Sequence, residues 1–255
     1  MLLIAVDIGN SSIHIGIYPQ DHFFGLRINT HPVQISETYQ QIVRQFIQET
    51  SVEQTCTGAI ISSVVPSLTA VMQKALGNLS STEPMVVGSY MKTGLSYHIP
   101  DPEKLGSDRI ANAVAAHEKY KSPVAVSDFG TATTLSIVGE QAGFLGGAIM
   151  PGIRLMNESL DKGADLLPEA PLEVPETPLG TDTVQCIQSG LFYGTAGAVE
   201  RILDETERER GITLNFIITG GFAESISPFL KRKHEHTPSL TLDGLRILYE
   251  RNRDA

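Results

Sequence analysis

The same local pattern occurs twice in this chain: an apolar run reaches an aspartate, a glycine follows two residues later, and small hydroxyl residues come next. The first copy has Asp7 and Gly9, and the second has Asp128 and Gly130, so the copies lie 121 residues apart (128 minus 7). A repeat at about half the length of a 255-residue chain is too long for the unit of a solenoid. It predicts two similar α/β halves.

We expect these halves at residues 1–118 and 119–255. Placing the two aspartates in register pairs Gly9 with Gly130, and it pairs Ser12 with Thr133. Residues 146–152 are rich in glycine and are expected to form a turn-rich segment after a strand. Apolar residues at three- and four-residue spacings predict helices, which we expect at residues 36–48, 67–79, 101–121 and 183–208.

The charge balance excludes function classes that need a basic surface. Lysine and arginine total 19 against 29 aspartates and glutamates, which gives a net charge of −10 at pH 7. Because such a surface repels phosphates, we expect no nucleic-acid partner and no binding to membranes. A phosphate site must then be local and built from backbone N–H groups, hydroxyls and a bound cation.

Cysteine usage and the N-terminal residues predict a cytoplasmic protein. Cys56 and Cys186 lack CxxC spacing, which disfavours a disulfide framework or a zinc site and favours a reducing compartment. The apolar run at residues 2–6 has no basic flank and is too short for a signal peptide or a membrane span.

The residues of the two repeated turns suit a phosphate group. Glycine lets the backbone approach a ligand closely, successive N–H groups can bind an anion, and Ser and Thr hydroxyls add donors. The aspartates would repel phosphate, so their chemistry fits a cation that itself contacts phosphate. A single turn of this kind is typical of an ordinary hairpin, whereas two in register favour a ligand site. Neither turn matches the P-loop or the dinucleotide-binding motif.

Five motifs, in this order, resemble those of type III pantothenate kinases. They are DIGNSS at 7–12, GSDRIANA at 106–113, DFGTATT at 128–134, GGAIMPG at 146–152 and TGGFA at 219–223. The resemblance covers nearly the whole chain. It implies an α/β, duplicated ribonuclease-H-like (actin-like ATPase) fold with two similar halves and an interdomain cleft. It also implies ATP-dependent phosphorylation of pantothenate to 4′-phosphopantothenate, the first step of coenzyme A synthesis.

The resemblance further implies what the chain binds. ATP would be the co-substrate, and both magnesium and a monovalent cation, potassium or ammonium, would be required. The family works as a homodimer, with pantothenate bound at the subunit interface.

Site residues carry over from the family one position at a time. Asp7 would handle magnesium, and Asp128 would bind the monovalent cation. Asp108 would be the general base. The pantothenate contacts would be Gly106, Ser107, Asp108, Arg109 and Thr183. The ATP contacts would be Asp7, Ile8, Gly9, Asn10, Ser11, Ser12, Ile13, His14, Thr131, Gly220 and Gly221.

The chemistry of Asp108 and Arg109 supports this assignment independently. Phosphorylation of an alcohol needs a positioned acceptor for its proton. We expect the adjacent Arg109 to keep Asp108 ionised, and Arg109 can also bind the carboxylate of pantothenate. The alternative is a surface Asp–Arg pair at a helix start, where aspartate is favoured in any case.

The chain departs from the family pattern at several positions. A tyrosine that contacts pantothenate usually stands where this chain has Ile99, and Tyr97 lies two residues earlier. We retain Tyr97 as a candidate contact. Many members carry an acidic residue where Leu135 and Ser136 stand, and the first turn reads GNSS where GNTN or GNTR is common.

Two other functions stay open at this point. One is a kinase of the same superfamily that acts on another small alcohol, such as a sugar. The other is a regulatory protein that keeps the nucleotide-binding fold without catalysis. Retention of Asp7, Asp108, Arg109 and Asp128 argues against the regulatory function.

Overall fold

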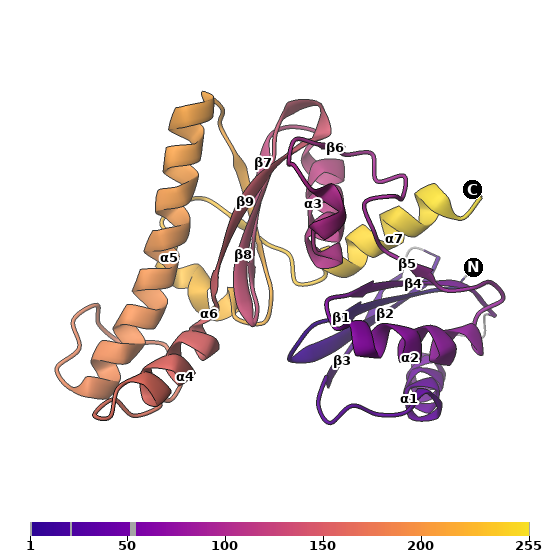
Figure 1. The fold of residues 1–255 in the computed structure, drawn as a ribbon, viewed down its shortest axis with the longest axis horizontal. Coiled ribbons are helices and arrows are strands. Elements are labelled where there is room, and N and C mark those ends of the chain that lie inside the picture. Colours follow the sequence, from indigo (N-terminus) through magenta and orange to yellow (C-terminus); the bar gives the residue numbers. More distant parts are fainter. Residues whose placement is uncertain (1, 21, 52–54, 255) are drawn as a thin grey trace. The chain divides into compact units, whose positions relative to one another are not determined.

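The computed structural model describes residues 2–20, 22–51 and 55–254, and the chain divides into two compact units (Figure 1). Unit 1 comprises Met1–Leu95, Pro100–Ala115 and Ser239–Ala255, and unit 2 comprises Ser96–Ile99 and Ala116–Pro238. Compared with the expected halves, 1–118 and 119–255, the C-terminal segment from Ser239 joins the first unit, and residues 96–99 and 116–118 join the second.

Unit 1 is a five-stranded sheet covered by helices on both faces. The strand order is β3-β2-β1-β4-β5. Strands β1, β2 and β3 are antiparallel, whereas β4 and β5 run parallel to β1. The elements are β1 (Leu2–Ile8), β2 (Ser12–Pro19), β3 (Phe24–Asn29), α1 (Ser36–Glu49), β4 (Cys56–Ser63), α2 (Pro66–Gly77), β5 (Met85–Val86), α3 (Ser107–Tyr120) and α7 (Leu240–Asn252).

Alternation along β1 decides which way its aspartate faces. Leu2, Ile4, Val6 and Ile8 pack with α1 and α2, whereas Leu3 and Ala5 pack with α3 and α7. Because side chains alternate between the two faces of a strand, Asp7 belongs to the face that α3 covers. The start of α3 carries the GSDR motif.

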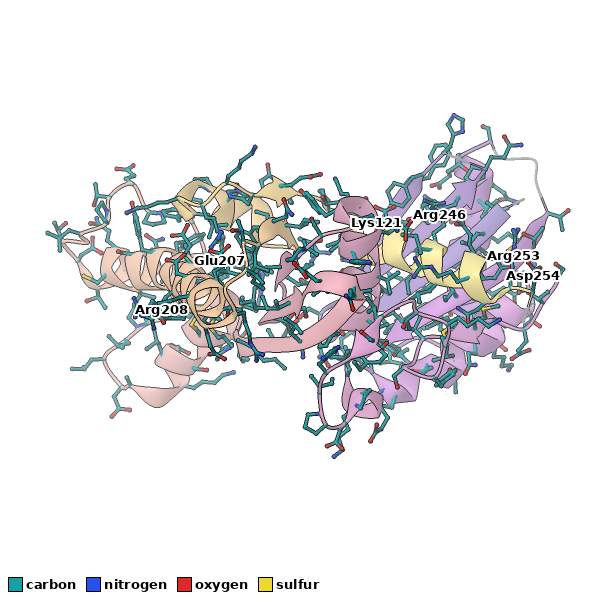
Figure 2. The ribbon with its side chains drawn as sticks, turned by 90° about the horizontal axis from the view of Figure 1, so that it is seen from above. Lys121, Glu207, Arg208, Arg246, Arg253 and Asp254 are labelled. Atoms are coloured by element: carbon teal, nitrogen blue, oxygen red, sulfur yellow. The ribbon has the colours of Figure 1, made fainter. Side chains whose placement is uncertain are left out.

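The C-terminal helix α7 is an integral part of unit 1. Its residues Leu242, Leu245 and Leu248 lie in the same apolar cluster as Leu3 of β1. At the edge of this cluster, the Tyr18 hydroxyl donates a hydrogen bond to Asp243 at 3.1 Å. Arg246 lies on the same helix (Figure 2), with its guanidinium 5.8 Å from the centre of the Tyr18 ring.

Unit 2 is a six-stranded sheet with the order β11-β10-β7-β8-β9-β6. Strands β7, β8 and β9 are antiparallel, and β10 and β11 run parallel to β7. The elements are β6 (Ser96–Tyr97), β7 (Val124–Phe129), β8 (Ala132–Val138), β9 (Gly143–Pro151), α4 (Ile153–Gly163), α5 (Thr183–Arg210), β10 (Asn215–Thr219), α6 (Ala223–Ile226) and β11 (Glu235–His236). Short 3₁₀ turns lie at Glu140–Ala142 and Ser227–Phe229 in unit 2 and at Pro102–Lys104 in unit 1.

The long helix α5 supplies much of the core of unit 2. It buries Leu191, Phe192 and Val199 in one cluster with Phe129 and Leu135 from the sheet. Asp182 caps the helix because its carboxylate accepts a hydrogen bond from the Gln185 N–H at 2.9 Å. Gly211 ends it in a left-handed conformation.

The two units share one topological core, which confirms the prediction of two similar α/β halves. In each unit an antiparallel hairpin is followed by a strand parallel to its first strand, giving β2-β1-β4 in unit 1 and β8-β7-β10 in unit 2. Asp7 and Asp128 occupy the same position in this core, near the end of its first strand.

The registers correct the predicted alignment after the turn. Asp7 pairs with His14, seven residues later (14 minus 7), whereas Asp128 pairs with Thr134, six residues later (134 minus 128). The second turn is therefore one residue shorter, and the pairing of Ser12 with Thr133 is wrong by one position.

A second correction concerns the glycine-rich segment at 146–152. Instead of turns, most of it continues strand β9, which runs to Pro151. Glycines there face ladder neighbours on β8, with Gly147 opposite Ser136, so backbone pairing overrides the weak strand preference of glycine.

Within the part of the chain that the structure describes, no helix combines the length and apolar composition needed to cross a bilayer.

Candidate active site

Hydrogen bonds within the turn and from Thr30 fix the backbone of the first repeated turn. The Gly9 N–H donates to the Ser12 carbonyl at 3.0 Å and closes the turn. Thr30, which is fully buried, donates through its hydroxyl to the Gly9 carbonyl at 2.7 Å and through its N–H to the Ser11 carbonyl at 3.2 Å. Asn10 at the tip is exposed, so the turn presents its tip to solvent on a fixed backbone.

Two residues predicted to bind ATP face away from this surface. The side chains of Ile8 and Ile13 are fully buried in the cluster formed with α1 and α2. Only their backbone groups can contribute to a ligand site at the turn.

Asp7 is held by a hydroxyl from the neighbouring strand. Strand pairing places Ser62 of β4 beside Asp7, and the Ser62 hydroxyl donates to Asp7 Oδ1 at 2.8 Å. The Ser62 oxygen also lies 3.0 Å from the hydroxyl of Ser107, the first residue of α3. Ser107 in turn accepts from the Ser63 N–H at 2.9 Å. A chain of hydrogen bonds therefore joins the end of β1 to the start of α3.

His14 extends the polar row across the sheet. It pairs with Asp7 on one side and with Arg27 on the other. Its Nε2 lies 3.1 Å from the Ser12 hydroxyl. Burial lowers the pKa of His14, and the Arg27 charge lowers it further, so this imidazole is neutral at pH 7.

The first turn of α3 carries Asp108 and Arg109. Helical bonding begins with the Ile110 N–H donating to the Gly106 carbonyl at 3.1 Å. A Cβ at position 106 would lie 2.4 Å from Asp108 Oδ1, so a larger residue there would displace this carboxylate.

Burial raises the pKa of Asp108. Desolvation causes the rise, and the Arg109 N–H and guanidinium oppose it without cancelling it. The Arg109 charge thus favours the ionised form, as expected, but the net shift is upward because folding removes water from around the carboxylate. Ionisation of Asp108 at neutral pH stays a prediction.

The second repeated turn lies at the corresponding place in unit 2. The Gly130 N–H donates to the Ala132 carbonyl at 3.1 Å, and the Gly152 N–H donates to the Thr131 carbonyl at 3.0 Å. Thr131 is exposed at the tip. This turn is thus tied to the start of α4, in the way that the first turn is tied to Thr30.

Asp128 has a hydroxyl residue opposite it on each neighbouring strand. Thr219 of β10 and Thr134 of β8 are its register partners. Gly220 follows with a φ of 96°, and a Cβ there would lie 2.4 Å from Asp128 Oδ1 and 2.6 Å from the Phe129 nitrogen. Both the backbone conformation and the close approach to Asp128 therefore require glycine at 220.

The donor sets of these turns fit hard cations that keep most of their own water. Among the described residues, no group of three or more His, Cys, Asp or Glu could enclose a metal ion. Asp7 and Asp128 each offer a carboxylate beside hydroxyl oxygens. Magnesium is commonly bound by one or two carboxylates together with substrate phosphates, so such a set suits it.

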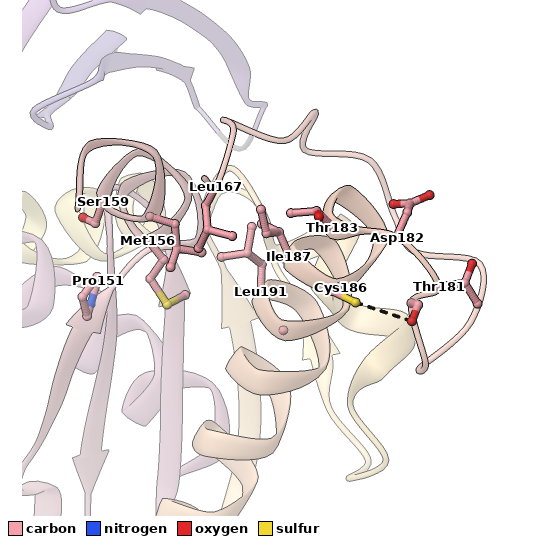
Figure 3. A pocket seen from close by; sticks show the side chains of 13 residues that line it. Pro151, Met156, Ser159, Leu167, Thr181, Asp182, Thr183, Cys186, Ile187 and Leu191 are labelled. Carbon is pink, nitrogen blue, oxygen red and sulfur yellow. Dashed lines mark hydrogen bonds between the residues drawn. The ribbon is translucent and has the colours of Figure 1, made fainter. Parts of the chain in front are cut away.

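Thr183 lies in a different part of unit 2, at the start of α5. It lines a mainly apolar groove of about 880 Å³ between α4 and α5 (Figure 3). The side chains of Met156, Leu167, Ile187 and Leu191 also line this groove. The sequence pattern identified Thr183 but not the groove.

Comparison with known proteins decides the family. The sequence model of the family described as type III pantothenate kinase matches residues 3–205. A type III pantothenate kinase of Geotalea daltonii is 38% identical over 256 residues, covering 100% of both chains.

This chain belongs to the type III pantothenate kinase family.

Solved structures are similar in fold. A Baf family protein from Campylobacter jejuni has a TM-score of 0.60 at 18% identity, covering 99% of this chain and 100% of that one. The activator of the 2-hydroxyisocaproyl-CoA dehydratase from Clostridium difficile, solved with bound ADPNP, has a TM-score of 0.53 at 9% identity, covering 96% and 91%. The expected actin-like ATPase and sugar kinase fold is confirmed.

The structure shows what the ring of Tyr97 packs against. Tyr97 lies on the short edge strand β6, and its ring centre is 6.2 Å from that of the buried Phe144. Ile99, at the usual tyrosine position, lies beside Gly146. Packing against Phe144 accounts for one face of the Tyr97 ring, and a contact of Tyr97 with pantothenate stays a prediction.

Ser62, Ser63 and Thr219 are the polar residues of these sites that the sequence pattern missed. Ser62 directly follows the apolar residues AII, and Thr219 directly follows FII; each lies at or near the end of a buried strand. A hydroxyl residue at this position, on the strand parallel to the one that carries the aspartate, is the signal that could have found them.

Asp108→Asn should raise the melting temperature at neutral pH by a few degrees. A carboxyl whose pKa is raised by folding stabilises the protein fully only below its unfolded pKa of about 3.9, and that contribution is lost as the pH rises through the folded pKa. Asparagine has no charge to bury, so the difference from wild type should vanish near pH 4. Calorimetry between pH 4 and 8 measures this.

The matched control is Asp101→Asn, at an exposed carboxylate paired with Lys104 at 2.8 Å. It should change the melting temperature by less than Asp108→Asn at neutral pH. A melting temperature that falls in Asp108→Asn, and falls most at neutral pH, would contradict the burial argument.

Proposed function

We propose that this chain transfers the terminal phosphoryl group of ATP to the primary alcohol of pantothenate, giving 4′-phosphopantothenate and ADP. Family membership over the full length supports this reaction. The observation that carries it is the GSDR segment at the start of α3, hydrogen-bonded through Ser107 and Ser62 to Asp7. Asp108 and Arg109 thus directly follow a residue that is linked by hydrogen bonds to the end of β1.

Asp108 is proposed as the general base. Transfer requires an acceptor for the alcohol proton as its oxygen attacks. A carboxylate with a pKa raised by burial is a better proton acceptor than an ordinary exposed one, and Asp108 has such a pKa.

Arg109 and Thr183 are proposed to orient pantothenate. A guanidinium binds a carboxylate with two parallel N–H donors, and pantothenate carries a carboxylate. Thr183 has an exposed side chain with a hydroxyl donor.

The turns at 7–14 and at 128–131, with Gly220 and Gly221, are proposed to bind ATP. Backbone N–H groups and hydroxyls at the turn tips would donate to phosphate oxygens. Asp7 would hold magnesium and Asp128 a monovalent cation, potassium or ammonium. When bound, these ions would offset the negative charge of the polyphosphate. At a net charge of −10, such local neutralisation is the means by which this chain can bind a polyanion.

A homodimer is proposed from the apolar surface of unit 2. The groove beside Thr183 is lined by Leu160 and Leu167, and Leu166 and Leu179 of the same region are 91% and 78% exposed. A second copy of the chain would cover this surface and bring the substrate-binding Thr183 to the interface. The cytoplasmic location of the chain stays a prediction.

Initial rates of ADP release test the reaction. Pantothenate with ATP should give turnover, and the rate should rise on addition of potassium. Sugars and other small alcohols with ATP should give no turnover. Asp108→Asn should lose at least about 100-fold in kcat while binding ATP normally, because only the proton acceptor is removed. Asp101→Asn serves as the control and should retain wild-type kcat.

Two results would contradict this account. Turnover with a sugar but not with pantothenate would point to another acceptor, and near-normal kcat in Asp108→Asn would exclude it as the base.

The solution mass tests the dimer. Light scattering should give about 55 kDa for the wild type, twice 27.6 kDa, and a lower mass for Leu166→Glu and Leu179→Glu. Val33→Glu, at a 48% exposed apolar residue of unit 1, is the control and should leave the mass unchanged. A monomeric wild type would contradict the proposed dimer. A dimer disrupted only by Val33→Glu would place the interface on another surface.

A further inference from the structure

The hydroxyls of Ser62 and Ser107 lie inside the protein. Ser62 is 0% exposed and Ser107 is 8% exposed. Buried hydroxyls need hydrogen-bond partners, and both find them within unit 1. Ser107 accepts from the Ser63 N–H at 2.9 Å and lies 3.2 Å from the Ser63 carbonyl and 3.0 Å from Ser62 Oγ.

The hydrogen bonds of these groups link Asp7 to the start of α3. An ionised Asp7 only accepts hydrogen bonds, so the single proton of Ser62 points to Asp7 Oδ1 at 2.8 Å. The Ser62 oxygen lies 3.0 Å from that of Ser107, which accepts from the Ser63 N–H and donates to the Ser63 carbonyl at 3.2 Å. Ser107 is therefore fixed on the backbone of Ser63, and Ser62 lies between Ser107 and the carboxylate.

This arrangement has two physical effects. Inside the protein the local dielectric is low, so the hydrogen bond from the Ser62 hydroxyl to the carboxylate is stronger than it would be in water. The arrangement also fixes the rotation of the Asp7 carboxylate relative to the first residue of α3. Loss of either hydroxyl would leave Asp7 less firmly oriented.

We propose that Ser62 and Ser107 are positioning residues for the nucleotide, which act through Asp7. Ser107 stands in the segment predicted to contact pantothenate, but its hydroxyl is engaged with Ser62 and Ser63. Its neighbours Asp108 and Arg109 supply the side chains for the acceptor substrate. This inference rests on the proposed role of Asp7 in binding magnesium-ATP.

Calorimetric titration with magnesium-ATP, without pantothenate, tests the positioning role. Ser62→Ala and Ser107→Ala should each weaken nucleotide binding by about 10-fold to 100-fold, the usual cost of losing a partner behind a metal ligand. Ser62→Thr keeps the donor on a β-strand and should bind within a few-fold of wild type. The KM for pantothenate should stay near wild type in Ser107→Ala.

Thr69→Val is the matched control. It removes a hydroxyl that donates to Ser63 Oγ at 2.9 Å, close to the chain but not on the path to Asp7. It should bind magnesium-ATP like the wild type. If Ser62→Ala fails to fold, Ser107→Ala and Ser62→Thr still decide the question.

Three outcomes would overturn the inference. They are unchanged nucleotide binding in Ser62→Ala, an equal loss in Thr69→Val, and a Ser107→Ala variant that raises the KM for pantothenate while binding ATP normally. A wild type that binds magnesium-ATP but does not phosphorylate pantothenate would instead remove the proposed acceptor, and the binding comparison would still stand.

Discussion

Parallel pairing of β1 with β4 is the constraint on which the candidate active site in unit 1 depends. This pairing places Ser62 beside Asp7. The alternation of β1 turns Asp7 toward the face covered by α3, while Leu2, Ile4, Val6 and Ile8 fill the opposite core. A one-residue slip would exchange the two faces and bury the carboxylate among α1 and α2. The apolar residues of β1 thereby keep the aspartate at the site.

Unit 2 repeats the same arrangement with local differences. Asp128 again lies near the end of the first strand of a hairpin, and Thr219 on the parallel neighbour takes the place of Ser62. The turn of unit 2 is one residue shorter. Gly220 lies close to the Asp128 carboxylate, whereas no glycine follows Ser62. The two units thus carry related turns that differ at the neighbouring strand.

The sequence predicted much of this because repeated local patterns have local causes. The spacing of Asp7 to Gly9 and of Asp128 to Gly130 indicated two hairpins, and both exist. Ser62 and Thr219 escaped notice because their importance arises from pairing with strands that are distant along the chain. The strand at 146–151 was mistaken for turns because its ladder partner on β8 outweighs glycine composition. The upward shift of the Asp108 pKa could not be predicted from the sequence, because burial, its largest cause, is a tertiary property.

The central claim, which stays a proposal, is that each repeated turn contacts the phosphates of magnesium-ATP. Hydrogen–deuterium exchange measured by mass spectrometry, with and without magnesium-ATP, tests it most directly. The account predicts slower exchange in the peptides that contain residues 9–12 and in those that contain residues 130–131. Slower exchange confined to other segments, with both turns unchanged at saturating nucleotide, would contradict it.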